Sequence, residues 1–164
     1  MQDEKTSNTT PGCGNALIAT SPEKVQVVPH STQQEFEKPK LPRHILVVED
    51  DSSLARLEAE VLTAWGYAVT LACTGELAAL AFRESIPDLV VLDLELSGNM
   101  SGWDVLQLLH SHSRVPVLLT SSEPAVRKRM HIRGESRSTL DHLPKPYPLQ
   151  ALLKRIERML VPLP

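Results

Sequence analysis

From His44 to Val161 the sequence alternates five times between a short apolar run and a stretch with helical periodicity. Continuous apolar runs rich in β-branched residues are typical of strands buried on both faces, as in a parallel sheet. The five predicted strands are Ile45–Val48, Tyr67–Ala72, Leu89–Asp93, Val115–Ser121 and Thr139–Leu143. Five β-α units of this size predict a doubly wound α/β fold, with a five-stranded parallel sheet and helices on both faces.

The intervening stretches carry start and stop signals for helices. Ser52 and Ser53 are the candidate N-cap region of the first helix, and Gly66 is its stop. The expected apolar residues of that helix are Leu54, Leu57, Val61, Leu62 and Trp65. The later helices are expected to open at Thr74-Gly75 (with Leu77, Leu80 and Ala81 on the apolar side), near Trp103, around Pro124 and at Pro148.

The first 43 residues differ from the rest in composition. They hold five of the thirteen prolines and many polar residues, so they bury too little apolar surface to offset the entropy of ordering. The predicted organisation is a disordered tail or linker over 1–43, a globular domain over 44–161 and a short end over 162–164. Cys13 and Cys73 give no sign of a disulfide framework or zinc site.

Charge and hydropathy limit the classes of partner. The net charge of −3 is spread along the chain, which gives no general footprint for direct nucleic-acid binding. No secretory signal and no apolar run of membrane-spanning length stand in the sequence. A cytoplasmic protein without a membrane partner is therefore expected.

Polar residues follow four of the predicted strands. In a parallel α/β sheet, ligands bind at the carboxyl ends of the strands. The residues expected there are Glu49, Asp50, Asp93, Thr120, Ser121 and Lys145. Each alone could be a turn or capping residue, but the set is hard to explain by packing.

The chemistry of this set predicts phosphoryl transfer with a metal ion. Neighbouring carboxylates repel one another when ionised, and Mg²⁺, which prefers oxygen ligands, removes that cost. One carboxylate can then attack a phosphoryl group and form an acyl phosphate. Such transfer depends mainly on positioning and charge neutralisation, to which a lysine and a hydroxyl contribute.

At this point the sequence resembles the response-regulator receiver domain of two-component signalling, which has a flavodoxin-like fold. The segments that carry the resemblance are ILVVEDD (45–51), PDLVVLDLEL (87–96), SGNMSGWDVL (97–106), VPVLLTSSE (115–123) and LPKPYPLQALLKRI (143–156). The resemblance implies a module that takes a phosphoryl group from a histidine kinase or histidine phosphotransfer protein. It also implies an output surface formed by the fourth helix, the fifth strand and the fifth helix.

The resemblance assigns roles to individual residues. Asp93 matches the phosphoacceptor, with Ser121 as the switch hydroxyl and Lys145 as the phosphate-contacting lysine. Glu49, Asp50, Asp93 and the backbone carbonyl of Glu95 match the Mg²⁺ ligands. The Lys145–Pro146 peptide bond is expected to be cis.

Three departures from the family pattern affect the switch rather than the chemistry. The loop after Asp93 is one residue longer, with Asn99 as the extra residue. His142 stands where an aromatic switch residue is expected. The stretch from Gly134 to Ser138 is longer and lacks the usual small residues.

Several functions remain open at this stage. The leading hypothesis is a stand-alone receiver without enzymatic turnover, because only four residues follow Leu160; a phosphorelay receiver or a piece of a hybrid kinase is the alternative. A phosphohydrolase is less well supported, because Glu95 stands where such enzymes usually carry a second aspartate. A flavin-binding protein is disfavoured because residues 49–51 would repel a phosphate. The most basic stretch is either a docking site for an acidic partner or a solvated helix face; it contains Arg127, Lys128, Arg129, Arg133 and Arg137. Trp65 and Trp103 are expected to be core or half-buried packing residues.

Overall fold

A computed structural model describes residues 18–20, 41–132 and 136–161. The strands are β1 (Ile18–Thr20), β2 (His44–Val48), β3 (Ala68–Ala72), β4 (Leu89–Asp93), β5 (Val117–Ser121) and β6 (Leu140–Pro144). The helices are α1 (Ser52–Ala64), α2 (Gly75–Glu84), α3 (Gly102–His112), α4 (Val126–Ile132) and α5 (Leu149–Leu160).

The strands form one sheet in the order β1-β3-β2-β4-β5-β6. Strands β2 to β6 are parallel, which confirms the predicted five-stranded doubly wound sheet. In addition, β1 pairs with β3 in antiparallel fashion at the edge of the sheet. Residues 18–20 were expected within a disordered tail, and backbone pairing with an open sheet edge places them in a strand instead. The remaining residues before Leu41 lie outside the described ranges.

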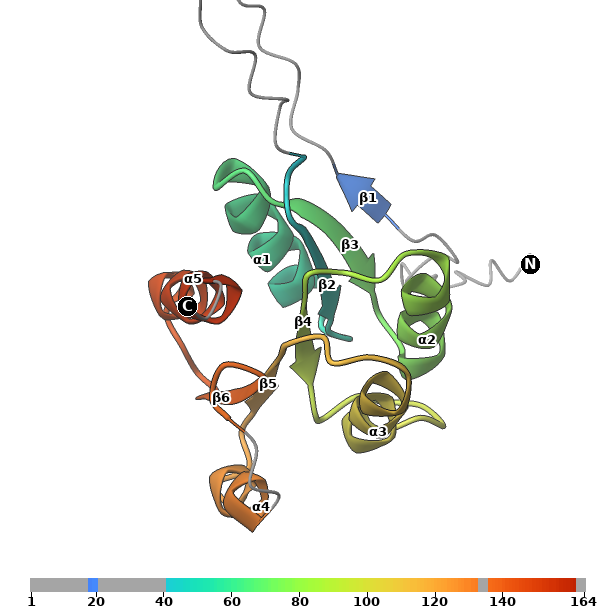
Figure 1. Ribbon diagram of the computed structural model, residues 1–164, viewed down its shortest axis with the longest axis vertical. Coiled ribbons are helices and arrows are strands. Elements are labelled where there is room, and N and C mark those ends of the chain that lie inside the picture. The colour runs from blue at the N-terminus through green and yellow to red at the C-terminus, as the bar shows by residue number, and fades with distance from the viewer. Residues whose placement is uncertain (1–17, 21–40, 133–135, 162–164) are drawn as a thin grey trace, which may run out of the picture.

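Helices cover both faces of the sheet (Figure 1). Helices α1 and α5 lie on one face, α2 and α3 lie on the other, and α4 lies near β5 and β6. Each face has its own apolar cluster, and the residues of the parallel strands contribute to both clusters alternately. The α1/α5 cluster includes Ile45, Val47, Leu62, Val91, Leu118, Leu152 and Ile156, and the α2/α3 cluster includes Leu46, Val48, Phe82, Val90, Leu92, Leu106 and Leu119. The continuous apolar runs are thus explained by burial on two sides.

The helix boundaries follow local capping interactions. Thr74 caps α2 as predicted, and its hydroxyl accepts a hydrogen bond from the amide of Leu77. The cap of α1 is Asp51 rather than Ser52 or Ser53, because the Asp51 carboxylate accepts from two amides of the first turn. Gly66 follows α1 with a φ of 90°, a conformation that favours glycine.

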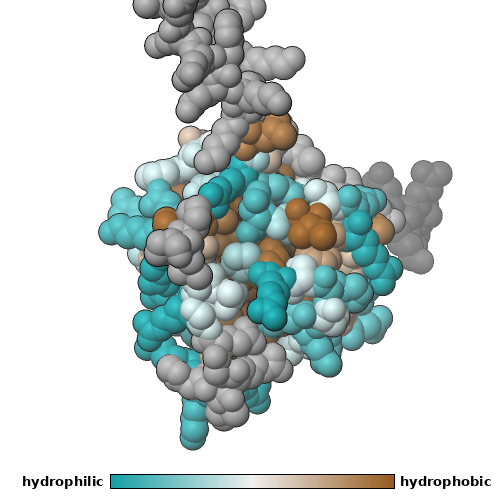
Figure 2. Space-filling view, viewed as in Figure 1, coloured by the Kyte–Doolittle hydropathy of each residue, from teal (hydrophilic) through white to brown (hydrophobic). Residues whose placement is uncertain are grey.

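In α1 and α2 the buried face of the helix differs from the face predicted from the sequence. In α1 the side facing the sheet consists of Ala55, Glu58, Ala59 and Leu62. Leu57 and Trp65 of the first helical stretch, and Leu80 of α2, are 46%, 59% and 47% exposed. Their expected burial is therefore wrong, and in α2 the side facing the sheet consists of Gly75, Ala78, Ala81 and Phe82. The face in Figure 2 is mostly polar, with apolar side chains exposed in small separate spots.

Cys73, directly after β3, is disulfide-bonded, which corrects the expectation that the cysteines stay unpaired. Its partner lies outside the described residues, and strand periodicity carries no signal for such a bond.

Among the helices of the described residues, none is both long and apolar enough to cross a bilayer.

Candidate phosphorylation site and metal centre

Three carboxylates meet at the carboxyl edge of the sheet. Asp93 is the last residue of β4, and Glu49 and Asp50 directly follow β2, its neighbour in the sheet. Asp93 and Glu49 are 2% and 3% exposed, whereas Asp50 is half-buried. One carboxylate oxygen of each residue lies within 4.8 Å of the other two. The parallel register thus brings together residues that are more than forty positions apart in the sequence.

A lysine reaches this cluster from a third strand. Lys145 directly follows β6, and its Nζ lies 2.9 Å from Glu49 Oε2 and 2.9 Å from Asp93 Oδ2. Burial opposes the charged form of Lys145, but hydrogen bonds to Glu49 and Asp93 outweigh burial and raise its pKa. The Lys145–Pro146 peptide bond is cis, as predicted.

The loop between β4 and α3 holds the carboxylates through backbone amides. Asp50 Oδ2 accepts hydrogen bonds from the amide and the hydroxyl of Ser97, at 2.9 and 2.6 Å. Asp93 Oδ1 accepts from the amide of Glu95 at 2.9 Å. Burial alone would raise the pKa of Asp50, but the bonds from Ser97 outweigh it and lower that pKa.

Glu49 experiences the opposite balance. Burial raises the pKa of Glu49; the hydrogen bond from Lys145 lowers it, and the charge of Asp93 raises it. The net direction is upward. The cluster therefore holds more negative charge than the one lysine neutralises.

This arrangement fits a hard divalent cation. Among the described residues, Glu49, Asp50 and Asp93 form the one group of candidate metal-ligating side chains. Their ligand atoms are all oxygens, which is the donor type that Mg²⁺ selects. A bound cation would neutralise the excess carboxylate charge and the charge of phosphoryl oxygens. The backbone carbonyl of Glu95 remains a predicted ligand.

Ser121 ends β5 and is fully buried at the same edge. Its hydroxyl accepts a hydrogen bond from the amide of Glu123 at 2.9 Å, and its carbonyl accepts from the amide of Lys145. Ser121 is thus tied to the segment that carries the lysine. The neighbouring Thr120 pairs with Asp93 in the β4–β5 register and is also buried.

His142 lies inside β6, opposite Leu119 of β5, and is 5% exposed. Neither ring nitrogen has a well-formed hydrogen bond. Burial lowers the pKa of His142, and the positive charge of Arg127 on α4 lowers it further. The nearby Ser121 backbone favours the protonated ring without making a good hydrogen bond to it.

The structure adds residues that the sequence did not indicate. Ser97 supports Asp50, and Gly102 lets the start of α3 approach the backbone of Asp93 and Leu94 so closely that a Cβ there would overlap both. Glu58 lies buried beneath the site, although a glutamate in an amphipathic helix normally indicates an exposed face. For the close approach at Gly102, the pair of small residues Ser101-Gly102 was the one signal in the sequence.

Comparison with known proteins agrees with this geometry. Residues 45–157 match the family model of the response regulator receiver domain. The chain belongs to this family. The described fold and the acidic cluster at the strand ends are those expected of a receiver domain.

Individual relatives give the same result. The chain is 37% identical over 120 residues to the probable transcriptional regulatory protein TcrX of Mycobacterium tuberculosis, covering 73% of this chain and 50% of the relative. It is 38% identical over 119 residues to the DNA-binding response regulator MtrA of Mycobacterium leprae, covering 72% and 51%. The chain thus spans about half the length of these curated relatives.

Solved structures resemble the same part of the chain. The N-terminal domain of a response regulator/sensory box/GGDEF protein from Carboxydothermus hydrogenoformans is 31% identical, with a TM-score of 0.62, covering 72% of this chain and 94% of that one. The signal receiver domain of a putative LuxO repressor protein from Vibrio parahaemolyticus is 27% identical, with a TM-score of 0.63, covering 73% and 91%. Both confirm the receiver fold.

Proposed function

We propose that this chain accepts a phosphoryl group on Asp93 from a histidine kinase or histidine phosphotransfer protein and thereby changes its binding to a partner. One observation carries the proposal: the buried Asp93 lies within 4.8 Å of Glu49 and Asp50 and 2.9 Å from Lys145. These are the groups that phosphoryl transfer to a carboxylate requires.

In the proposed reaction, one oxygen of Asp93 attacks the phosphorus of a phosphohistidine. The P–N bond breaks, an O–P bond forms, and the histidine nitrogen leaves with the bonding electron pair. The ammonium of Lys145 moves from the carboxylate to a phosphoryl oxygen, and the hydroxyl of Ser121 donates to another. Glu49, Asp50 and Asp93 would hold Mg²⁺, which supplies charge neutralisation when bound.

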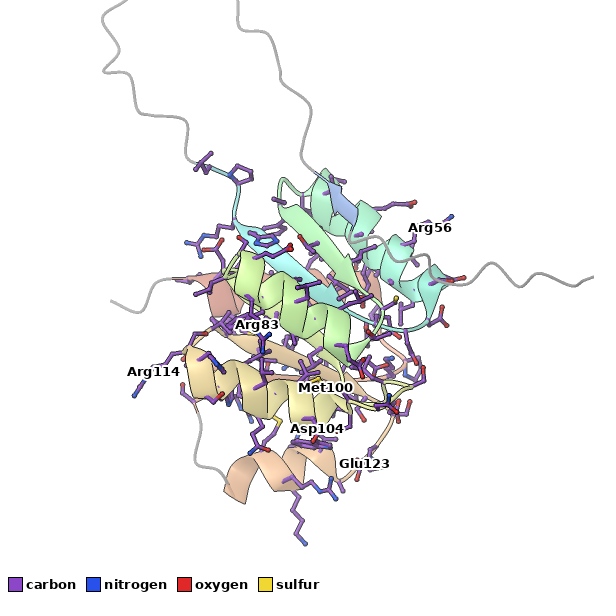
Figure 3. All side chains as sticks on the ribbon, turned by 90° about the vertical axis from the view of Figure 1, so that its right-hand side faces the viewer. Arg56, Arg83, Met100, Asp104, Arg114 and Glu123 are labelled. Atoms are coloured by element: carbon purple, nitrogen blue, oxygen red, sulfur yellow. The ribbon has the colours of Figure 1, made fainter. Side chains whose placement is uncertain are left out.

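The proposed output surface consists of α4, β6 and α5. On α4, Arg127, Lys128 and Arg129 are exposed, so this surface is basic and suits an acidic partner. Arg129 also lies 5.5 Å from the ring centroid of Trp103 on α3, which connects α4 to the helix next to the site. In Figure 3, Glu123 in the loop before α4 lies on the same side as Asp104 in the first turn of α3 and Met100 just before that helix. Arg83 and Arg114 lie on the opposite side.

In this proposal, the chain is a phosphorylation-controlled binding module in the cytoplasm rather than an enzyme that turns over a substrate. A phosphorelay receiver uses the same site and remains the alternative within signalling. The two differ in the fate of the phosphoryl group, which passes to a second histidine protein in a relay.

The test is intact-mass measurement after incubation with acetyl phosphate, with and without Mg²⁺. We expect one added phosphoryl group that requires Mg²⁺ and is absent in Asp93→Asn. Asp88→Asn is the matched control, because Asp88 is exposed and contacts the amide of His44 rather than the site. An unmodified wild-type mass under saturating donor would contradict the proposal, and steady release of phosphate with repeated turnover would favour a phosphohydrolase.

A further inference from the structure

A buried polar pair lies beneath the phosphorylation site. Glu58 of α1 is 1% exposed, and its Oε1 accepts a hydrogen bond from the Tyr147 hydroxyl at 2.5 Å. The second carboxyl oxygen of Glu58 has no hydrogen-bond partner. Burying a carboxyl group that is only partly satisfied costs free energy, so its presence in an otherwise apolar layer requires an explanation.

The position of Tyr147 links this pair to Lys145. Tyr147 lies two residues after Lys145, in the connection between β6 and α5. Its ring packs against the apolar cluster of the α1/α5 face. The hydroxyl group of Tyr147 therefore joins α1 to the segment that presents the lysine.

The electrostatic environment links the pair to the same site. Burial raises the pKa of Glu58 to about 7; the Tyr147 hydrogen bond and the positive charge of Lys145 oppose this increase, and the charges of Glu49 and Asp93 add to it. Burial, and then the charge of Glu58, raise the pKa of Tyr147, so its hydroxyl remains a donor at neutral pH. Ionised Glu58 would add negative charge close to the place where phosphoryl oxygens must bind.

On the basis of the proposed function, we propose that Glu58 and Tyr147 are positioning residues for phosphoryl transfer. Their hydrogen bond holds the Lys145 segment against α1, and the proton on Glu58 limits the negative charge around Asp93. Neither residue touches the phosphoryl group, and both act through Lys145 and through the local field.

The test measures the rate of phosphoryl uptake from acetyl phosphate at saturating Mg²⁺ between pH 6 and 8. Wild-type uptake is expected to slow as pH rises, with an inflection near 7, the pKa of Glu58. Glu58→Gln keeps an acceptor for Tyr147 but cannot ionise, so this inflection should disappear. Tyr147→Phe removes one hydrogen bond and should slow uptake about three- to tenfold at every pH. Glu60→Gln, on the exposed side of the same helix, is the matched control and should behave as wild type.

Thermal unfolding of each variant shows whether it is folded under the assay conditions. If Tyr147→Phe does not fold, the pH profile of Glu58→Gln still decides, because a purely structural role would leave the inflection in place. A wild-type pH profile in Glu58→Gln together with a wild-type rate in Tyr147→Phe would overturn the inference and leave the phosphoacceptor proposal intact. An unmodified wild-type protein would instead overturn the phosphoacceptor proposal itself.

Discussion

Buried polar residues in this protein differ in how completely their neighbours satisfy them. Lys145 has two carboxylate partners, and Asp141 of β6 accepts from Arg155 and Arg158 of α5. His142, the next residue of β6, has no well-formed partner for either ring nitrogen. A buried unpaired donor or acceptor costs about 1–3 kcal/mol. His142 is therefore the residue of β6 whose buried position is least well compensated.

We predict that His142→Phe raises the free energy of unfolding by about 1 kcal/mol at pH 7, because it removes the unpaired nitrogens. The gain should increase as pH falls below 6.5. The folded-state pKa of His142 lies below its usual value of 6.5, so the unfolded chain binds the proton first and acid destabilises the wild type. Urea unfolding from pH 5 to 8 measures both effects.

The difference in unfolding free energy between the wild type and His142→Phe isolates the contribution of His142. Glu58 has a raised pKa and therefore the opposite pH dependence. Its contribution to stability is fully present below pH 4.5 and is lost as pH rises towards 7. Glu58 is present in both proteins, so this contribution cancels in the difference. The charged neighbours of His142, namely Arg127, Asp141 and Arg155, are also unchanged. Parallel stability curves across this pH range would show that burial of His142 does not affect its titration.

At the level of elements, the connection from β4 to α3 determines the geometry around Asp93. Its amides and the Ser97 hydroxyl bind two of the three carboxylates, and α3 begins against the backbone that follows Asp93. The capping box of Ser101 and Asp104 fixes the start of α3.

We predict that Gly102→Ala lowers stability by about 1–3 kcal/mol and also slows phosphoryl uptake. The added methyl group would overlap the carbonyl of Asp93 and the Cα of Leu94, and backbone atoms cannot move aside as a side chain can. Gly98→Ala is the comparison, because a Cβ at Gly98 meets nothing within 4 Å, although its φ of 117° still causes strain. Urea unfolding and the acetyl phosphate assay measure the two effects, and equal uptake rates in both variants would contradict the prediction.

At the scale of the whole molecule, two apolar clusters hold the domain together. Among the residues that the structure describes, the members of both clusters lie between Ile45 and Leu160. Strand β1 adds only a three-residue antiparallel pairing at the sheet edge. The receiver fold should therefore not depend on the segment before Leu41.

We predict that removing residues 1–40 leaves the circular dichroism spectrum of the domain and its phosphoryl uptake unchanged. The loss of the β1 pairing should lower the free energy of unfolding by no more than about 2 kcal/mol, because each net hydrogen bond contributes about 0.5–1.5 kcal/mol. Both proteins are compared under reducing conditions, so that the disulfide at Cys73 does not contribute. Failure of the shortened chain to fold would show that the N-terminal segment belongs to the domain.

The sequence by itself determined the five-stranded parallel sheet, the helix order and the strand ends that carry Glu49, Asp50, Asp93, Ser121 and Lys145. These features follow from periodicity and from the parallel topology, which are local or nearly local properties. The cis bond before Pro146 came from the family resemblance and is confirmed.

Only the tertiary structure decided which face of each helix is buried and which polar groups meet. Leu57 and Trp65 have the spacing of core residues but lie outside, while Glu58 lies inside, where one of its carboxyl oxygens accepts a hydrogen bond from Tyr147. The antiparallel pairing of β1 with β3 and the disulfide at Cys73 have no signal in the local sequence pattern. Periodicity reports how a segment divides apolar from polar residues, whereas the partner of each buried group is fixed only when the segments pack together.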